Sequence, residues 1–346
     1  MDVDEIIEST VRALMFLAGV LGNNWLAVRS IPPRPSALRT NELLFINLAV
    51  SNLITNYLVD LPDTMADIAG RWFLGDAYCA VFRFCADLSE TSSIFSTLFI
   101  SVYWYQKLVG SLKRGGGPVR LDSLRLVACL LAGSWVVATV FSIPHCFFVA
   151  VEDEGGEGGE NGSHVECMDA FPDPQAKRTY EALYLTLANA LPVAGIVYAS
   201  AQIVVTLMQN QKRIRGHGGG DTGAVKDDNG RNHASSEGGD SALGSASNTK
   251  AGGGGGGEAR AGQPAVKPSP GSSTQVRAAK SVVAVASIFV VCWVTHLVLR
   301  ISSNIHTSPL VVEVASYIAA SYTCIIPYIF LYGVKKLSCS CRGARQ

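Results

Sequence analysis

Three ionisable residues, Arg83, Asp87 and Glu90, lie inside a long and largely apolar stretch of the chain. Their spacing of four and then three residues places them on one face of a helix. At 1.5 Å of rise per residue they lie roughly 6, 12 and 16 Å along that helix from Cys79. Charges of both signs on one face suit the binding of a polar or charged small molecule. The simpler interpretation is an internal ion pair between Arg83 and Asp87, which would only fix helix packing and would not involve Glu90.

Other polar and aromatic residues could form the wall of the same site. Trp293 and His296 are three residues apart, so they can face the same side of a helix. A lone histidine is more often a buried core residue, so the case for His296 rests on the neighbouring tryptophan. A mostly apolar pocket with a few polar anchors is typical of small-molecule sites. The remaining candidates for its wall are Arg300, Tyr184, Tyr317, Glu181 and Glu313.

The same residues do not match a catalytic or metal-binding pattern. His296 has no H-E-x-x-H companion in its stretch, and His145 lies near one end of another. A retinal protein needs a lysine in its last helix, and residues 308–332 contain none. We therefore expect no enzymatic activity, no metal ion and no cofactor.

The elements that must position these residues are membrane helices. The 346 residues are 48% hydrophobic and only 16% charged, with a mean hydropathy of +0.26. Soluble proteins have near 25% charged residues. The 28 basic and 28 acidic residues cancel, which argues against a nucleic-acid binder. An ordinary soluble enzyme and a wholly disordered chain are also excluded.

Seven apolar stretches are long enough to cross a ~30 Å hydrocarbon core as helices. The first carries Asn23 and Asn24 and continues past any cleavage pattern, so we interpret it as a retained helix and not a cleaved signal peptide. The sequence thus predicts an all-α membrane protein, a seven-transmembrane helix bundle at residues 11–336 between an N-terminus of residues 1–10 and a tail of residues 337–346. The stretches cover residues 11–28, 43–61, 79–105, 124–151, 180–208, 281–300 and 308–332.

The orientation follows from the charges of the loops. Basic residues cluster after the first and third stretches and in the tail, while the N-terminus and residues 152–166 are acidic. Because basic loops stay in the cytoplasm, we expect the N-terminus outside and the C-terminus inside. The Asn161-Gly162-Ser163 sequon falls in an outside loop, where glycosylation of Asn161 can occur.

Two further segments carry predictions. Residues 209–275 hold 17 of the 34 glycines, and we expect a disordered cytoplasmic loop there. Cys339 and Cys341 follow two lysines at the membrane edge, which suits palmitoylation, although two idle thiols are an equal alternative. On the oxidising outer side lie Cys79 and Cys167, with Cys85 and Cys146 as alternatives for a disulfide.

Several motifs resemble the rhodopsin-like (class A) G-protein-coupled receptors. Gly22-Asn23 resembles their GN pair, and NLAVSNL at residues 47–53 resembles NLAxxDL, with Asn52 in place of the aspartate. Trp135 and Pro192 match landmarks of their fourth and fifth helices. This resemblance implies a disulfide between Cys79 and Cys167.

Other motifs of that class are altered. Tyr103-Trp104-Tyr105 stands in place of DRY, Thr295 replaces the proline of CWxP, and IPYIF at residues 326–330 replaces NPxxY. We therefore expect no ionic latch at residue 104, no proline kink at residue 295 and no sodium ligand at residue 52.

These losses, with SVYWYQKLVGSLKRG and RLDSLRLV around the second cytoplasmic loop, are similar to the vomeronasal type 1 receptors and their fish counterparts. The resemblance implies a chemosensory receptor in the plasma membrane of sensory neurons, which detects a small organic odorant or pheromone and activates a heterotrimeric G protein. A bitter-taste-type receptor and, less well supported, a seven-helix transporter or channel are the alternatives. The expected partners of the chemosensory receptor are the odorant or pheromone, the G protein and membrane lipid. No nucleic acid is expected.

Overall fold

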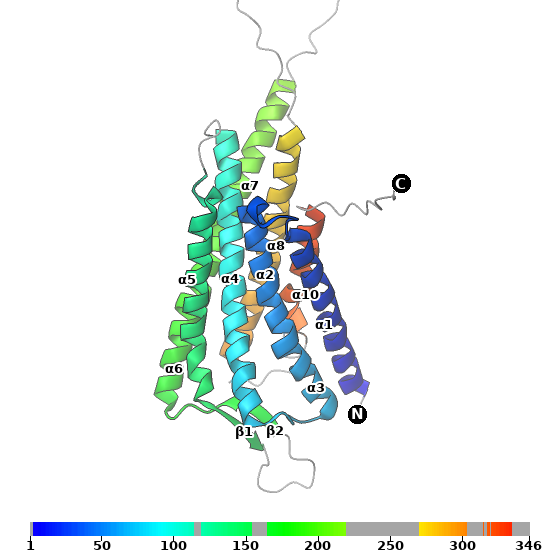
Figure 1. The fold of residues 1–346 in the computed structure, drawn as a ribbon, viewed down its shortest axis with the longest axis vertical. Helices are drawn as coiled ribbons and strands as arrows, with labels where there is room; N and C mark the ends of the chain where they lie inside the picture. The colour runs from blue at the N-terminus through cyan, green and yellow to red at the C-terminus, as the bar shows by residue number, and fades with distance from the viewer. Residues whose placement is uncertain are drawn as a thin grey trace, which may run out of the picture.

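The computed structural model describes residues 3–113, 119–153, 165–218, 270–302, 314, 317–318 and 320–333, which form one elongated helix bundle (Figure 1). Within these residues, seven rods run along the bundle and confirm the predicted architecture. The first described helix begins, and the last described helix ends, toward opposite ends of the bundle (Figure 1). The rods are α1 (Val3–Ser30); α2 (Thr40–Thr55) with η2 (Asn56–Asp60) and α3 (Leu61–Ala69); α4 (Gly75–Lys113); α5 (Leu124–Ser142); α6 (Pro174–Leu183) with η5 (Tyr184–Ala190) and α7 (Leu191–Gly218); α8 (Pro270–Ser302); and α10 (Tyr322–Gly333).

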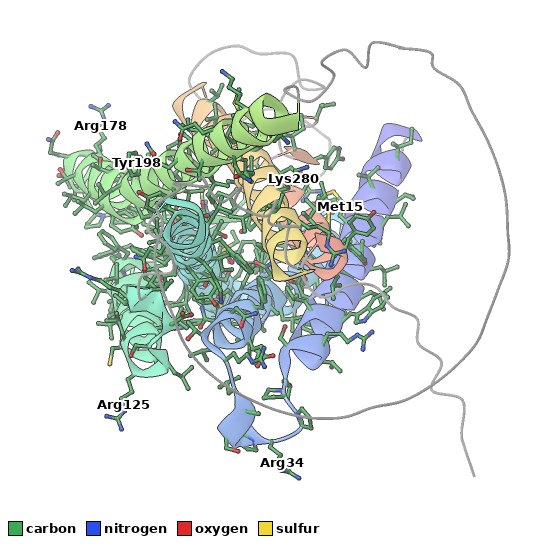
Figure 2. The ribbon with its side chains drawn as sticks, turned by 90° about the horizontal axis from the view of Figure 1, so that it is seen from above. Met15, Arg34, Arg125, Arg178, Tyr198 and Lys280 are labelled. Atoms are coloured by element: carbon green, nitrogen blue, oxygen red, sulfur yellow. A yellow bond between two sulfur atoms is a disulfide. The ribbon has the colours of Figure 1, made fainter. Side chains whose placement is uncertain are left out.

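The third rod, α4, is the central one. It packs against α2, α5, α7 and α8, so its polar residues face other helices and not lipid. This position explains why α4 is absent from the described helices that are both long and apolar enough to cross a membrane. Seen from above, peripheral residues such as Arg125 and Tyr198 point away from the bundle (Figure 2). The segments that do meet both criteria are Ser9–Ser30, Thr40–Ala69, Leu124–Cys146, Pro174–Lys212 and Val276–Thr295.

Two predicted boundaries are wrong. The fourth stretch was expected to be helical through residue 151, but α5 ends at Ser142 and a 3-10 turn (η4, Ile143–Cys146) follows, with Pro144 in its first turn. The apolar residues after it belong to strand β1 (Val149–Asp153), which pairs antiparallel with β2 (Val165–Asp169). The helices on either side of the glycine-rich segment are also longer than expected, since α7 continues to Gly218 and α8 begins at Pro270. Residues 219–269 lie outside the described part of the chain.

Two rods contain a wider π-helical turn at matching places. In both η2 and η5, the turn is followed by a Leu-Pro pair, at Pro62 and Pro192. Proline has no N–H to donate and its ring crowds the carbonyl four residues earlier, which breaks the regular helical ladder there. A π turn contains one residue more than a regular α-helical turn. Such turns are frequent at functional sites.

The bundle core is apolar toward the middle and in the half away from the β1–β2 hairpin. It includes Phe45, Ile94, Leu108, Phe289 and Phe330, each at most 3% exposed. Gly22 allows α1 to approach α10 closely, because a Cβ there would lie 2.8 Å from the Tyr328 ring and 2.9 Å from Pro327. The Gly22-Asn23 pair is therefore a packing requirement between the first and last rods.

Candidate functional site

The β1–β2 hairpin is tied to the first turns of α4. Cys79 of α4 is bonded to Cys167 of β2, which confirms the disulfide implied by the resemblance and leaves Cys85 and Cys146 as free thiols. The strand register places Val151 opposite Cys167, and the Val151 N–H donates to the Asp76 carboxylate at 3.1 Å. The hairpin is thus fixed over the end of the bundle where the predicted charged residues begin.

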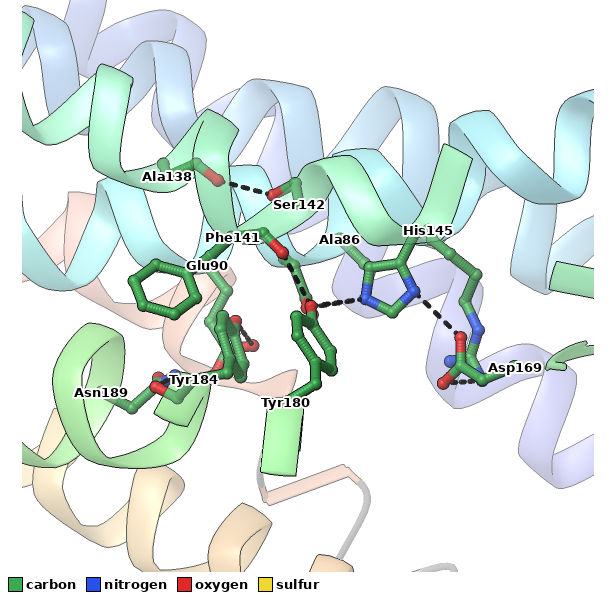
Figure 3. A network of polar contacts seen from close by, with 12 residues as sticks. Ala86, Glu90, Ala138, Phe141, Ser142, His145, Asp169, Tyr180, Tyr184 and Asn189 are labelled. Carbon is green, nitrogen blue, oxygen red and sulfur yellow. Dashed lines mark hydrogen bonds and ion pairs between the residues drawn. The ribbon is translucent and has the colours of Figure 1, made fainter. Parts of the chain in front are cut away.

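A chain of charged side chains joins this hairpin to α4 and η4 (Figure 3). The Arg83 guanidinium lies 3.3 Å from Asp169 of β2. The other Asp169 oxygen lies 3.0 Å from Nδ1 of His145, and Nε2 of His145 lies 2.9 Å from Asp87. Alternating positive and negative groups therefore run from the hairpin to Asp87, in the third of α4 nearest the hairpin.

Tyr180 of α6 closes the inner end of this network. Its hydroxyl lies 3.0 Å from both Asp87 and His145 Nε2, and 2.8 Å from the Phe141 carbonyl oxygen. A neutral imidazole carries one N–H, so only the protonated ring donates to both carboxylates at once. With His145 as imidazolium, each of its N–H groups meets a charged acceptor.

Asp169 is the member of the network outside the membrane-spanning rods. Burial by itself would raise the pKa of its carboxyl group. The hydrogen bond from His145 and the positive charges of Arg83, His145 and Lys177 outweigh burial and hold this pKa below its usual value. Asp169 is therefore ionised at neutral pH and acts as the acceptor that binds Arg83 and His145 together.

Deeper in the bundle, Glu90 of α4 faces Tyr184 of η5. The Tyr184 hydroxyl donates to the Glu90 carboxylate at 3.3 Å, and the tyrosine is fully buried. Its ring stacks on that of Tyr180 with centroids 6.1 Å apart and meets Phe141 edge-on at 6.0 Å. The carboxylate thus lies beside an aromatic wall built from α5, α6 and η5 (Figure 3).

The structure separates the predicted site residues into groups. Arg83 pairs with Asp169 and not with Asp87, because the hairpin and η4 supply closer partners. The structure therefore does not show the internal ion pair of the simpler interpretation. Trp293 is partly buried against the core, and Tyr317 is half-buried. The side chains of His296 and Arg300, and residues Glu313, Asn161, Cys339 and Cys341, lie outside the described part of the structure.

His145, Asp169 and Tyr180 were not predicted as site residues. Asp169 lies two residues after Cys167, so the disulfide brings it to α4. His145 follows Pro144, which ends the regular helix and turns the chain inward. Tyr180 lies one helical turn before Tyr184, which was a candidate, and this spacing was the one available signal for it.

Two of the altered motifs, at residues 295 and 52, lie in the described helices. α8 is continuous through Thr295, whose hydroxyl donates to the Val291 carbonyl oxygen at 2.9 Å. Asn52 donates to the Asn23 side-chain oxygen at 3.0 Å and accepts from the Ser93 hydroxyl at 2.8 Å. The side-chain N–H group and the side-chain oxygen of Asn52 are thus both hydrogen-bonded to neutral groups.

The residues that stand in place of the DRY motif are aromatic and buried. Tyr103 and Trp104 are 3% and 8% exposed and meet edge-on, so packing replaces the ionic latch. Lys107 donates to the Tyr103 hydroxyl at 2.8 Å and approaches Asp122 at 3.9 Å. Gln106 of α4 also accepts from the Leu121 N–H at 3.3 Å, so Lys107 and Gln106 together hold the contact between α4 and the following loop.

A seven-rod helix bundle with a disulfide-tethered hairpin over one end and polar groups facing inward defines a membrane receptor. The chain belongs to the family described as 7 transmembrane receptor (rhodopsin family), whose model matches residues 23–330. This membership confirms the resemblance to class A receptors and the prediction that the chain is not an enzyme.

Relatives of known function are distant. The human galanin receptor type 1 is 24% identical over 61% of this chain and 58% of its own length. The human C-X-C chemokine receptor type 3 is 26% identical over 62% of this chain and 55% of its own length. The gonadotropin-releasing hormone receptor of Octopus vulgaris is 21% identical over 59% of this chain and 48% of its own length. The matched part therefore spans about half of each relative's length, as these shares show.

Proposed function

We propose that this chain is a G-protein-coupled receptor in the plasma membrane of sensory neurons, with its N-terminus outside. It binds a small organic odorant or pheromone within the helix bundle and activates a heterotrimeric G protein. Family membership supports the signalling role. The altered motifs at residues 103–105, 295 and 326–330 support the chemosensory part, because they resemble the vomeronasal type 1 receptors.

The observation that carries the proposed ligand site is the approach of Glu90 and Tyr184 inside the bundle. A carboxylate beside stacked aromatic rings suits a small molecule with a donor group, such as an amine, on an apolar body. In such a site the carboxylate accepts a charge-assisted hydrogen bond and the rings contact the apolar part. Trp293, Tyr317, His296 and Arg300 remain the proposed opposite wall.

Arg83 and Asp87 have a different role in this proposal. Both are engaged by the hairpin network, and Asp87 is 7% exposed with His145 and Tyr180 on its carboxylate. They position α4, the hairpin and α6 around the ligand. Their effect on ligand binding is therefore indirect, through the placement of Tyr180 and the adjoining Tyr184.

A peptide receptor is the second candidate. It is favoured by the names of the relatives, which include receptors for galanin, a chemokine and gonadotropin-releasing hormone. In that case the ligand would contact the hairpin as well as the bundle.

Ligand screening on cells distinguishes these candidates. Cells expressing the receptor with a promiscuous G protein are treated with panels of small amines, small acids, neutral odorants and neuropeptides. We expect responses to small amines that weaken in Glu90→Gln at unchanged surface expression. Responses to peptides alone would overturn the small-molecule proposal. Substrate flux without any G protein would overturn the receptor proposal.

A further inference from the structure

An open groove of about 740 Å³ lies on the outer side of the bundle, far from the hairpin, where α1, α8 and α10 meet. Its wall follows α10 from Cys324 to Gly333, which is about 14 Å at 1.5 Å per residue. The Tyr328 hydroxyl donates to the Ala18 carbonyl oxygen at 2.9 Å and closes the groove between α10 and α1. Ile325 and Tyr332 leave 38% and 74% of their surfaces exposed, so the apolar wall is uncovered among the described residues.

Two basic residues of α8 line the groove. The Arg277 guanidinium donates through Nε to the Gly333 carbonyl oxygen at 3.0 Å, which holds its remaining N–H groups beside the end of α10. Lys280, one turn further along, is exposed and lies on the side of the bundle where α1 and α10 also lie (Figure 2). None of the residues that line the groove is acidic. The groove therefore has a net positive charge of two.

The close packing of α10 on α8 fixes this geometry. A Cβ at Gly333 would lie 1.5 Å from the Ser281 hydroxyl oxygen, so only glycine allows the two helices to meet here. Arg277, Lys280 and Ser281 all line the groove, and Arg277 is held against the end of α10 by its hydrogen bond to the Gly333 carbonyl oxygen. The site is built by the packing of two helices and is more than a pair of surface charges.

We propose that this groove binds an anionic phospholipid of the cytoplasmic leaflet. Its length of about 14 Å matches roughly half of a ~30 Å hydrocarbon core, which is the depth of one leaflet. One acyl chain lies along Ile325, Tyr328 and Ala284, and the phosphate meets Lys280 and Arg277. The loops at this end are basic, and the cytoplasmic leaflet carries the anionic lipids.

A lipid bound there touches both α8 and α10. It therefore stabilises the arrangement in which these helices are packed together. The consequence is a receptor whose thermal stability depends on the headgroup charge of the lipid in this groove. This effect of the lipid headgroup on thermal stability does not require the ligand at the other end of the bundle.

The test uses the purified full chain in nanodiscs of phosphatidylcholine, with or without phosphatidylserine. Lipid retained by the receptor is measured by native mass spectrometry, and unfolding by thermal denaturation. We expect selective retention of phosphatidylserine and a higher melting temperature with it. Lys280→Gln should weaken retention about fivefold, the equivalent of about 1 kcal/mol. Ala284→Phe, which fills the groove without changing charge, should also reduce retention.

Arg125→Gln is the matched control. Arg125 is an exposed basic residue at the start of α5, at the same end of the bundle and outside the groove (Figure 2). Equal retention of the two lipids would overturn the proposal. A loss in Arg125→Gln as large as that in Lys280→Gln would also overturn it, because the effect would then be one of general charge. Unchanged retention in Ala284→Phe would place the lipid elsewhere.

Discussion

Nε2 of His145 lies 2.9 Å from Oδ2 of Asp87, and this contact joins the turn after α5 to α4. The other ring nitrogen contacts Asp169 of the hairpin, which also binds Arg83. A single imidazolium thus connects three parts of the chain that are far apart in sequence. The arrangement makes the hairpin, α4 and α6 one unit around the proposed ligand site.

Replacing His145 should be strongly destabilising. In His145→Phe the Asp87 and Asp169 carboxylates lose their shared donor and keep only Tyr180 and Arg83 as partners. Each lost hydrogen bond to a charged group costs about 1.5 to 3 kcal/mol. We expect little receptor at the cell surface, measured by antibody labelling of intact cells. Cys146→Ser, at the exposed neighbouring residue, is the control and should be normal. Normal surface labelling of His145→Phe would show that the network does not support the fold.

Glu90→Gln and Tyr184→Phe should change agonist potency without removing receptor from the surface. Each variant keeps the size of the side chain but removes a charge or a hydroxyl from the proposed site. A lost charge-assisted hydrogen bond of ~1.5 to 3 kcal/mol corresponds to roughly a tenfold to hundredfold shift. Dose-response curves in cells measure it, with Thr139→Val on the exposed side of α5 as the control. If both variants keep the wild-type potency and ligand ranking, Glu90 and Tyr184 do not bind the agonist, and the region of Trp293 becomes the next candidate site.

Breaking the disulfide should prevent normal folding. Cys167→Ser frees the hairpin from α4, and loss of a native disulfide typically costs about 2 to 5 kcal/mol in small domains. Surface expression and ligand response should both fall. Cys129→Ser removes an exposed free thiol of α5 and should have no effect. Two free thiols at residues 79 and 167 in the mature wild-type protein, found by mass spectrometry, would contradict the bond.

Asn52 should be required for stability although it is not a carboxylate. Asn52→Leu leaves the Asn23 oxygen and the Ser93 hydroxyl without their partner, at a cost of about 1 to 3 kcal/mol for each group. Thermal unfolding in detergent should show a lower melting temperature. Asn24→Leu, one position from Asn23 and exposed, is the control. Equal melting temperatures of the two variants would argue against the network.

The contribution of Asp169 should depend on pH in a defined direction. Its pKa is lowered in the folded protein, so its stabilising effect is present above the usual carboxyl pKa of about 3.9 and is lost as the pH falls through the lower folded value. Asp169→Asn should therefore melt below wild type at pH 7, and the difference should shrink below about pH 4. A constant difference over the whole range would show that charge is not the cause.

The sequence by itself determined the seven membrane rods, the class A family and the face of α4 that carries Arg83, Asp87 and Glu90. These features depend on local hydropathy and on helical periodicity, which a single segment encodes. Tyr184 was one of several candidate wall residues, and the sequence did not distinguish it from the others.

Only the tertiary structure decided the partners of those charges. Arg83 meets Asp169 because the disulfide and the strand register bring the hairpin to α4, and Asp87 meets His145 because the chain turns after Ser142. Tyr184 reaches Glu90 because a π turn before Pro192 sets its direction. Contacts between residues 58 to 94 positions apart depend on how whole rods pack, and no local pattern in the chain encodes them.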